Sequence, residues 1–184
     1  MGHGREGSLQ RAPRENTAAY KALYTDEERR RRDRSVWTLV QGVLAPVQFL
    51  AFLISLALIL RYLATGDDLF AAQISIVVKT LTLYAIMVTG SIWEKEVFGR
   101  YLFARPFFWE DVFSMLVLAL HTAYLLYLYL DALSPAGQMV LALAAYATYV
   151  VNAGQFLWKL RLARLERPVQ ANPPPAGLAA EPSR

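Results

Sequence analysis

Four long stretches of the chain contain almost no charged side chains. They cover residues 38–63, 71–93, 111–130 and 136–158. Each is close to the roughly 20 residues that a helix needs to cross about 30 Å of hydrocarbon. They are too long for strands and lack the alternating pattern of membrane barrels. Because lipid cannot hydrogen-bond to an open backbone, the sequence predicts four transmembrane helices.

The distribution of charge favours a membrane protein over a soluble helical bundle. Residues 38–158 hold only 12 charged side chains among 121 residues, whereas the other 63 residues hold 22. A soluble globule spreads charge over its whole surface, and a disordered chain is far less apolar. The predicted fold class is therefore all-α, a polytopic integral membrane protein with four transmembrane helices in a bundle. The chain has no Cys, which excludes disulfides, thiolate metal sites and cysteine nucleophiles.

Lys and Arg set the predicted orientation, because the cytoplasmic ends of membrane helices carry an excess of them. Basic residues precede the first span, separate the second from the third and follow the fourth, whereas the other two loops contain only Arg61. We therefore expect both termini and the middle loop in the cytoplasm. The indole rings favour the same interface. The Trp residues at these ends are Trp37, Trp93, Trp109 and Trp158.

Three regions follow from this division of the chain. Residues 1–24 are expected to form a disordered tail, residues 25–167 the membrane domain with a basic helix before the first span, and residues 168–184 a disordered Pro-rich tail. Thr25 and Glu28 have the spacing of a helix capping box. The arginines after them are better explained by orientation and contact with anionic lipid than by nucleic acid, so no nucleic-acid partner is expected.

Ionisable side chains inside a membrane span cost about 2.5 to 3.5 kcal/mol on insertion scales, so each is a candidate functional residue. Lys79 lies in the second span, and is predicted either to extend to the nearer interface or to have a buried role. His121 lies near the centre of the third span, where the alternatives are a hydrogen-bonded core histidine and a ligand or catalytic group.

Helical spacing gives each span one polar stripe, and the simplest packing turns all four stripes inward. In the third span, the stripe runs from Glu110 through Ser114, Val117 and His121 to Tyr124. The other stripes contain Gln41, Gln48 and Ser55 in the first span, Lys79, Thr82, Ile86 and Gly90 in the second, and Thr148, Asn152 and Gln155 in the fourth.

Four carboxylates bracket the middle loop among large aromatic side chains. The acids are Glu94, Glu96, Glu110 and Asp111, and the aromatic residues are Trp93, Phe107, Phe108 and Trp109. Acids beside apolar surface are harder to ionise, which suits a general acid working near neutral pH. The alternatives are a favourable interaction of Glu110 and Asp111 with a helix dipole, and charge balance against nearby basic residues.

Longer strings of residues resemble a known family. These are RRDRSVWTLVQGVLAPVQFLAFL, KTLTLYAIMVTGSIWEKEVFGRYLF, FFWEDVFSMLVLALHTAYL and AAYATYVVNAGQFLWKLRLARL, in this order. They are similar to the 3-vinyl bacteriochlorophyllide hydratase family over about residues 21–166. The resemblance implies a hydro-lyase of bacteriochlorophyll biosynthesis. It would add water to the C3 vinyl group of chlorophyllide a or a related vinyl chlorin, giving the 3-(1-hydroxyethyl) product. It also implies a multi-pass protein of the bacterial inner membrane, either the cytoplasmic membrane or the intracytoplasmic photosynthetic membrane. Such a protein would contact lipid and other enzymes of pigment synthesis.

The residue roles are predicted from the chemistry of that reaction. Hydration needs an acid, a positioned water and a base, and no cofactor is expected. Glu94 or Glu110 is predicted to donate the proton, and Asp111 or its neighbour to receive the proton of water. His121 is predicted either to ligate the substrate magnesium axially or to orient water. The predicted substrate-binding residues are Trp93, Trp109, Phe108, Lys95, Arg100, Arg105 and Asn152, with the basic ones holding the propionate. The alternative is a non-catalytic (bacterio)chlorophyll-binding or assembly protein, which would not need the carboxylates.

Overall fold

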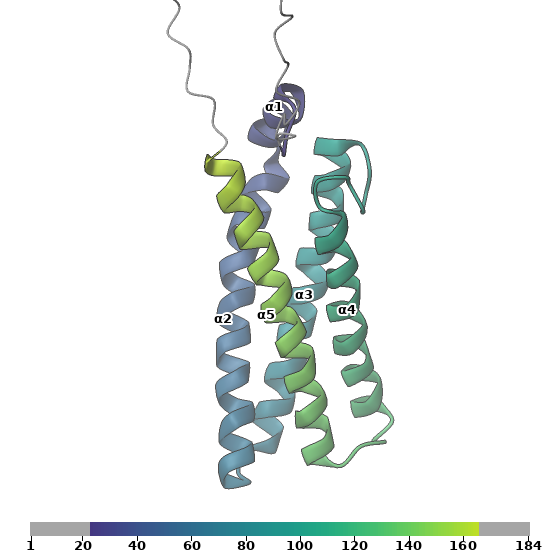
Figure 1. The fold of residues 1–184 in the computed structure, drawn as a ribbon. Helices are drawn as coiled ribbons and strands as arrows, with labels where there is room; N and C mark the ends of the chain where they lie inside the picture. The colour runs from purple at the N-terminus through teal and green to yellow at the C-terminus, as the bar shows by residue number, and fades with distance from the viewer. Residues whose placement is uncertain (1–22, 166–184) are drawn as a thin grey trace, which may run out of the picture.

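The computed structural model describes residues 23–165, which form five helices (Figure 1). These are α1 (Asp26–Arg34), α2 (Val36–Thr65), α3 (Leu69–Phe98), α4 (Phe108–Tyr129) and α5 (Pro135–Leu165). The last four are long enough and apolar enough to cross a membrane. The prediction of an all-helical chain with four apolar spans is therefore confirmed.

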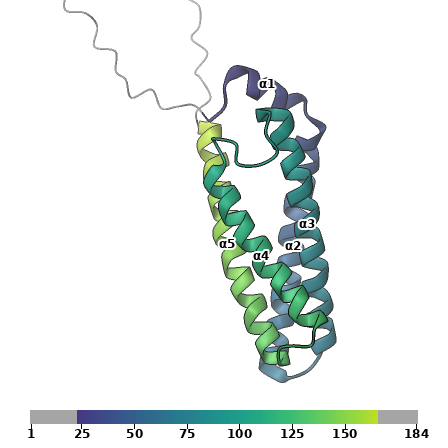
Figure 2. The same cartoon turned by 90° about the vertical axis from the view of Figure 1, so that its right-hand side faces the viewer.

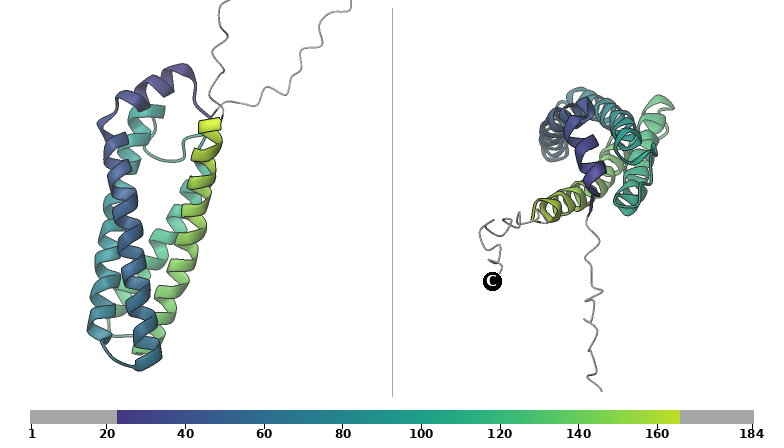
Figure 3. Two further views of the ribbon diagram at one scale, coloured as in Figure 1. Left: turned by 90° about the vertical axis from the view of Figure 1, so that its left-hand side faces the viewer. Right: turned by 90° about the horizontal axis from the view of Figure 1, so that it is seen from above.

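The four long helices run up and down as two pairs. α2 packs along α3 and α4 crosses α5 at close range, whereas the two pairs contact each other less (Figure 2). α1 and the loop 99–107 lie at the same end of the bundle as the last turns of α5, and we call this the capped end (Figure 3). The short turns 66–68 and 130–134 lie at the opposite end.

Local sequence explains where the helices begin and end. The Thr25 hydroxyl accepts from the Glu28 N–H at 3.2 Å, and the Glu28 carboxylate accepts from the Thr25 N–H at 2.8 Å, which confirms the capping box. The Ser35 side chain caps the start of α2. Gly66 and Gly99 follow α2 and α3 with φ of 76° and 80°, a left-handed conformation that glycine adopts without steric cost.

The helices extend further than the apolar spans predicted. The middle loop covers only residues 99–107, which is less than the interval between the predicted second and third spans. Glu94, Glu110 and Asp111 therefore lie on helices. A helix of 30 residues, such as α3, is about 45 Å long and exceeds the hydrocarbon thickness of about 30 Å. Its last turns can leave the membrane while their backbone stays hydrogen-bonded.

The predicted polar stripes face the interior. All five stripe residues of α4 are buried, and the stripe residues of the other helices are buried or half-buried. The outer faces of the helices expose Leu, Val and Phe side chains, as suits lipid. An apolar cluster fills the half of the bundle away from α1. It consists of Phe52, Ile59, Ala72, Ile76, Tyr124, Met139, Ala142, Ala145 and Tyr146.

Candidate functional site

Glu94 and Asp111 form a buried carboxyl pair at the capped end. Glu94 comes from the last turns of α3 and Asp111 from the first turn of α4. Their carboxyl groups lie close enough to interact, and the two residues are only 5% and 3% exposed. The short loop 99–107 brings these helix ends together. Two of the predicted catalytic residues thus share one site.

Two consecutive N–H groups of this loop bind the carboxyl pair. The Phe103 N–H donates to Asp111 Oδ2 at 2.7 Å, and the Ala104 N–H donates to Glu94 Oε2 at 3.2 Å. Phe103 has a φ of 59°, in the left-handed region that non-glycine residues rarely adopt. Such a turn directs successive N–H groups to one side, as in anion-binding backbone nests. This backbone strain costs roughly 1–3 kcal/mol and persists only where surrounding contacts hold the backbone in place. The hydrogen bonds to the carboxyl pair are such contacts.

A carboxyl pair of this kind can both give and take a proton. Two buried carboxyl groups in contact repel each other when both are ionised, so they retain one proton between them. The two loop N–H groups stabilise the single negative charge that remains. The site therefore holds an acid and a base within hydrogen-bonding distance of each other.

An aromatic cluster packs beside the carboxyl pair. It consists of Tyr24, Trp93, Phe98, Phe107 and Phe156. Phe107 is central, with ring centroids 5.8 Å from Trp93 and 5.9 Å from Phe156. The Trp93 indole N–H donates to Thr38 Oγ1 at 2.9 Å, which fixes the indole ring. Burial raises the pKa of the Tyr24 phenol above its ordinary value, and the nearby Arg32 partly opposes this shift.

Three of the predicted binding residues face outward instead. Phe108 and Trp109 are 44% and 67% exposed and pack on each other at 5.5 Å. Their position suits the membrane interface. The exposed Lys95 ammonium donates to the Gly99 carbonyl at 3.1 Å and lies 5.3 Å from the Tyr101 ring centre. None of the three contributes to the interior of the site.

Glu110, the other predicted proton donor, forms an ion pair. Its Oε2 lies 2.6 Å from Lys159 Nζ, and the same ammonium donates to the Pro106 carbonyl. Glu110 is 7% exposed. Lys159 thus occupies one oxygen of Glu110 through a charge-assisted hydrogen bond. Glu110 therefore has a lysine as its partner, whereas Asp111, its neighbour in the chain, is bound by a loop N–H group.

His121 lies deeper in the bundle and contacts Lys79. Both residues are fully buried, which decides against an extended Lys79. The Lys79 ammonium lies 2.5 Å from His121 Nε2, and His121 Nδ1 lies 2.7 Å from the Val117 carbonyl. Both ring nitrogens are thus engaged with the protein. His121 is ten residues from Asp111, about 15 Å along the helix axis, so it belongs to a different level of the bundle.

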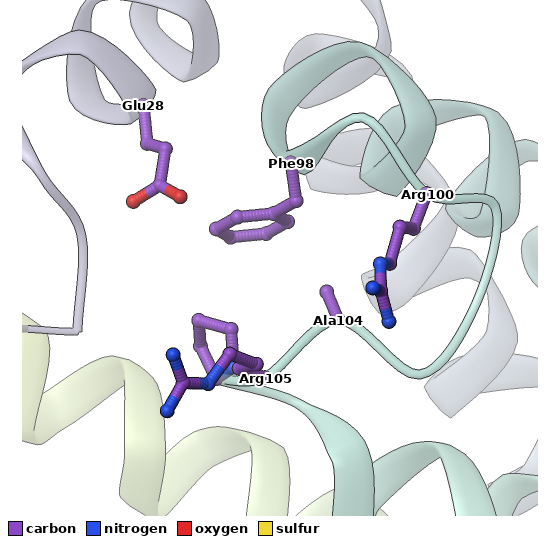
Figure 4. A pocket seen from close by; sticks show the side chains of 6 residues that line it. Glu28, Phe98, Arg100, Ala104 and Arg105 are labelled. Atoms are coloured by element: carbon purple, nitrogen blue, oxygen red, sulfur yellow. The ribbon is translucent and has the colours of Figure 1, made fainter.

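Arg100 and Arg105 line a pocket of about 140 Å³ (Figure 4), and the carboxyl pair lies near it. The rest of the lining is Glu28, Phe98, Ala104 and Pro106. Ala104 connects the two features, because its N–H binds Glu94. Two guanidinium groups beside an aromatic ring suit a carboxylate on an apolar molecule. The structure thus brings two of the three predicted propionate-binding residues together.

Asn152 faces α4 from α5. Its Nδ2 donates to Ser114 Oγ at 2.8 Å, whereas its Oδ1 is enclosed and accepts no hydrogen bond from the described residues. Gln155 Oε1 is in the same state. The other enclosed side-chain atoms without a partner in residues 23–165 are Tyr24 OH, Gln48 Nε2 and Tyr124 OH. Buried polar atoms normally have partners, so these atoms are exceptions within the described residues.

Sequence reasoning missed several groups of the site. The N–H groups of Phe103 and Ala104 leave no trace in residue type, because every residue except proline carries one. Lys159 is the first of the basic residues after the fourth span, which predict only the orientation. Its spacing of four from Gln155 and seven from Asn152 places it on their helix face, and that spacing is the signal that could have found it.

Together these features define a polytopic helical membrane protein with a shared-proton carboxyl pair and an arginine-lined pocket at one end. A family model described as 2-vinyl bacteriochlorophyllide hydratase matches residues 24–162. The chain therefore belongs to that family, which confirms the resemblance found in the sequence; the vinyl group is numbered 2 or 3 according to nomenclature.

Relatives agree with this assignment. The chain is 64% identical over 155 residues to the 2-vinyl bacteriochlorophyllide hydratase of Cereibacter sphaeroides, and the match covers 84% of this chain and 96% of that protein. It is 67% identical over 146 residues to the protein of the same name from Rhodobacter capsulatus, covering 79% and 85%. No solved structure matches the chain.

Proposed function

We infer that this protein adds water to the ring vinyl group of a vinyl bacteriochlorophyllide or of chlorophyllide a, giving a 1-hydroxyethyl group. It acts as a hydro-lyase in bacteriochlorophyll synthesis, like the relatives that carry this name. The mechanism rests on the buried carboxyl groups of Glu94 and Asp111, which two consecutive loop N–H groups bind. Hydration needs one proton given and one taken back, and this pair offers both functions.

The carboxyl pair gives its proton to the terminal carbon of the vinyl group. The electron pair of the double bond forms the new C–H bond, and the positive charge on the inner carbon is delocalised into the macrocycle. A water oxygen then bonds to that carbon, and the water's surplus proton returns to the carboxyl pair. One water is consumed, the pair is restored, and no electron is gained or lost. Glu94 is assigned as the donor and Asp111 as its partner.

The pocket of Arg100 and Arg105 binds the substrate propionate. The guanidinium groups supply charge-assisted hydrogen bonds, and Phe98 supplies apolar surface beside them. Because Ala104 belongs both to this pocket and to the carboxyl pair's ligands, an anchored propionate keeps the macrocycle close to the acid. Trp93 and Phe107 extend the aromatic surface at this end.

His121 retains its two proposed roles, axial ligation of the substrate magnesium or orientation of water. Ligation through Nε2 requires that Lys79 gives up its contact, since that nitrogen lies 2.5 Å from the Lys79 ammonium. The capped end is placed in the cytoplasm on account of its Arg and Lys residues. The protein then lies in the bacterial inner membrane, in contact with lipid and with other enzymes of pigment synthesis.

The test is incubation of membranes that contain the protein with chlorophyllide a, followed by measurement of pigment mass. The expected product is heavier by one water. E94Q and D111N are expected to lose activity by about a hundredfold or more, as removal of a general acid does. E96Q is the matched control, because Glu96 lies two residues from Glu94 on the exposed side of α3. Pigment that binds without a change in mass would instead support the non-catalytic alternative.

A further inference from the structure

Two enclosed amide carbonyls face α4 from one side of α5. Asn152 Oδ1 and Gln155 Oε1 accept no hydrogen bond from residues 23–165. Asn152 is 9% exposed, and its Nδ2 is held by Ser114 Oγ at 2.8 Å. This contact holds the Asn152 amide against α4, and its oxygen has no donor among the described residues. Enclosed acceptors without donors point to a small molecule that brings O–H or N–H groups.

The helix register places Asn152 and Gln155 within about one turn of Asp111 along the helix axis. Asn152 contacts Ser114, and Lys159 contacts Glu110 at 2.6 Å, so α5 runs antiparallel to α4 here. Gln155 lies between Asn152 and Lys159 on the same helix face, since spacings of three and four residues recur on one side. Its level on α4 is thus between Ser114 and Glu110. Ser114 is three residues from Asp111, about 4.5 Å along the axis.

The chemistry of the substrate excludes the pigment itself as the missing donor. In a magnesium chlorin the metal holds all four ring nitrogens, and an ionised propionate accepts hydrogen bonds only. The pigment therefore brings no N–H or O–H group to two carbonyl oxygens. Water brings two O–H donors. The hydroxyl of the product brings one, and its oxygen is the one that water supplied.

We propose that Asn152 and Gln155 are positioning residues that hold the reactant water beside the carboxyl pair. This inference rests on the proposed function. The two amide oxygens accept the water's hydrogen atoms, which leaves a lone pair of its oxygen free to attack. The proton moves from the carboxyl pair to the vinyl carbon, the water oxygen bonds to the cationic carbon, and the released proton returns to the carboxyl pair.

This arrangement predicts a specific defect when the amide oxygens are removed. The cation formed by protonation has two fates, attack by water or loss of a proton to give the vinyl group again. In heavy water, the second fate leaves deuterium in the recovered vinyl substrate. Without a positioned water the cation still forms, because Glu94 and Asp111 are intact, but it reverts more often.

The experiment compares Q155M and N152L with wild type in membranes, with chlorophyllide a in heavy water at low conversion. Mass spectrometry measures hydrated product and deuterium in the remaining substrate. We expect the ratio of exchange to hydration to rise by about tenfold or more in both variants, as loss of reactant positioning does. Q41M is the matched control. The Gln41 amide also lies in the bundle, but it donates to Thr89 Oγ1 at 2.7 Å, so its ratio is expected to equal that of wild type.

Each outcome of this experiment either supports or overturns the water-positioning role. An unchanged ratio in Q155M and N152L, or a rise of the same size in Q41M, would overturn the water-positioning role. A proportional loss of exchange and hydration would also overturn it, because that result means damage to the acid or the fold. Wild-type membranes that give neither hydrated product nor exchange would contradict the proposed function itself, which separates the two failures.

Discussion

The Lys79 ammonium and His121 Nε2 lie 2.5 Å apart between α3 and α4, in the middle of the membrane span. With Nδ1 directed at the Val117 carbonyl at 2.7 Å, the ring donates through Nδ1 and accepts through Nε2, which describes a neutral imidazole. The rings of Tyr146 and Tyr149 lie 5.0 and 4.2 Å from the ammonium and stabilise it by cation–π interaction. The Lys79 side chain is thus held inside the bundle by groups from two neighbouring helices.

Replacement of His121 is expected to destabilise the protein more than replacement of Lys79. H121F leaves the buried Lys79 side chain without its acceptor, whereas K79M leaves only one ring nitrogen unpaired. The difference should be about 1–3 kcal/mol, measured as the lower midpoint of thermal unfolding of H121F in detergent. The K79M/H121F double variant should be at least as stable as H121F. An H121F protein that unfolds at or above the midpoint of K79M contradicts this account of the pair.

Ligation of the substrate magnesium by His121 predicts a separate result with the same variants. K79M frees Nε2, so it should bind the magnesium pigment at least as tightly as wild type does. H121F should bind the magnesium pigment less tightly, by about tenfold or more, yet bind the magnesium-free pigment as wild type does. Pigment absorbance titrations measure both affinities. Equal losses for the two pigments in H121F would remove magnesium ligation and leave the water-orienting role.

Replacement of Glu110 is expected to spare the chemistry. Its carboxylate is paired with Lys159 at 2.6 Å rather than with the carboxyl pair, so E110Q should retain hydration within about threefold while E94Q loses it. K159M should cost about 1–3 kcal/mol of stability, since it leaves a buried carboxylate unpaired. Hydration rates and thermal unfolding check the two statements. Full activity of E94Q together with loss in E110Q would reverse the assignment of the donor.

The fold was predictable because two physical signals are local. The length of the apolar stretches predicted the four spans. The helical spacing of the polar residues predicted the inward face of α4 from Glu110 to Tyr124. The ends of the helices were not predictable from hydropathy, because an α-helix does not stop where the hydrocarbon stops. α3 continues until Gly99 turns the backbone into the left-handed region, and Glu94 is consequently a helix residue.

The pairings within the site were less predictable than its members. A helical spacing shows which face a residue occupies, but not which neighbouring helix meets that face. Glu94 could have paired with a loop arginine, and Lys79 could have extended to the interface; the packing of α3 on α4 decides both. The strained Phe103 is invisible for another reason, since its contribution is a backbone N–H and a φ of 59°.

The left-handed conformation of Phe103 predicts that hydration activity depends on how readily the residue at position 103 adopts a positive φ. F103N should retain the loop and the hydration activity, because Asn adopts this region more readily than most residues. F103V should lose activity by about tenfold or more, since a β-branched residue at positive φ is strongly disfavoured and the N–H would leave Asp111 Oδ2, now at 2.7 Å. Hydration rates in membranes with matched protein amounts measure this order. Equal activity of F103V and F103N contradicts a catalytic need for this turn.

The arginine pocket predicts a defect in substrate binding rather than in chemistry. R100M and R105M should each raise KM by about tenfold or more, as loss of a charge-assisted hydrogen bond does, with a smaller change in kcat. K95M is the control, because Lys95 donates to the Gly99 carbonyl outside the pocket. With the propionate converted to its methyl ester, wild type, R100M and R105M should show similar KM values, since no carboxylate remains to be bound. A KM for the acid that stays at the wild-type value in both arginine variants, or that rises equally in K95M, would place the propionate elsewhere.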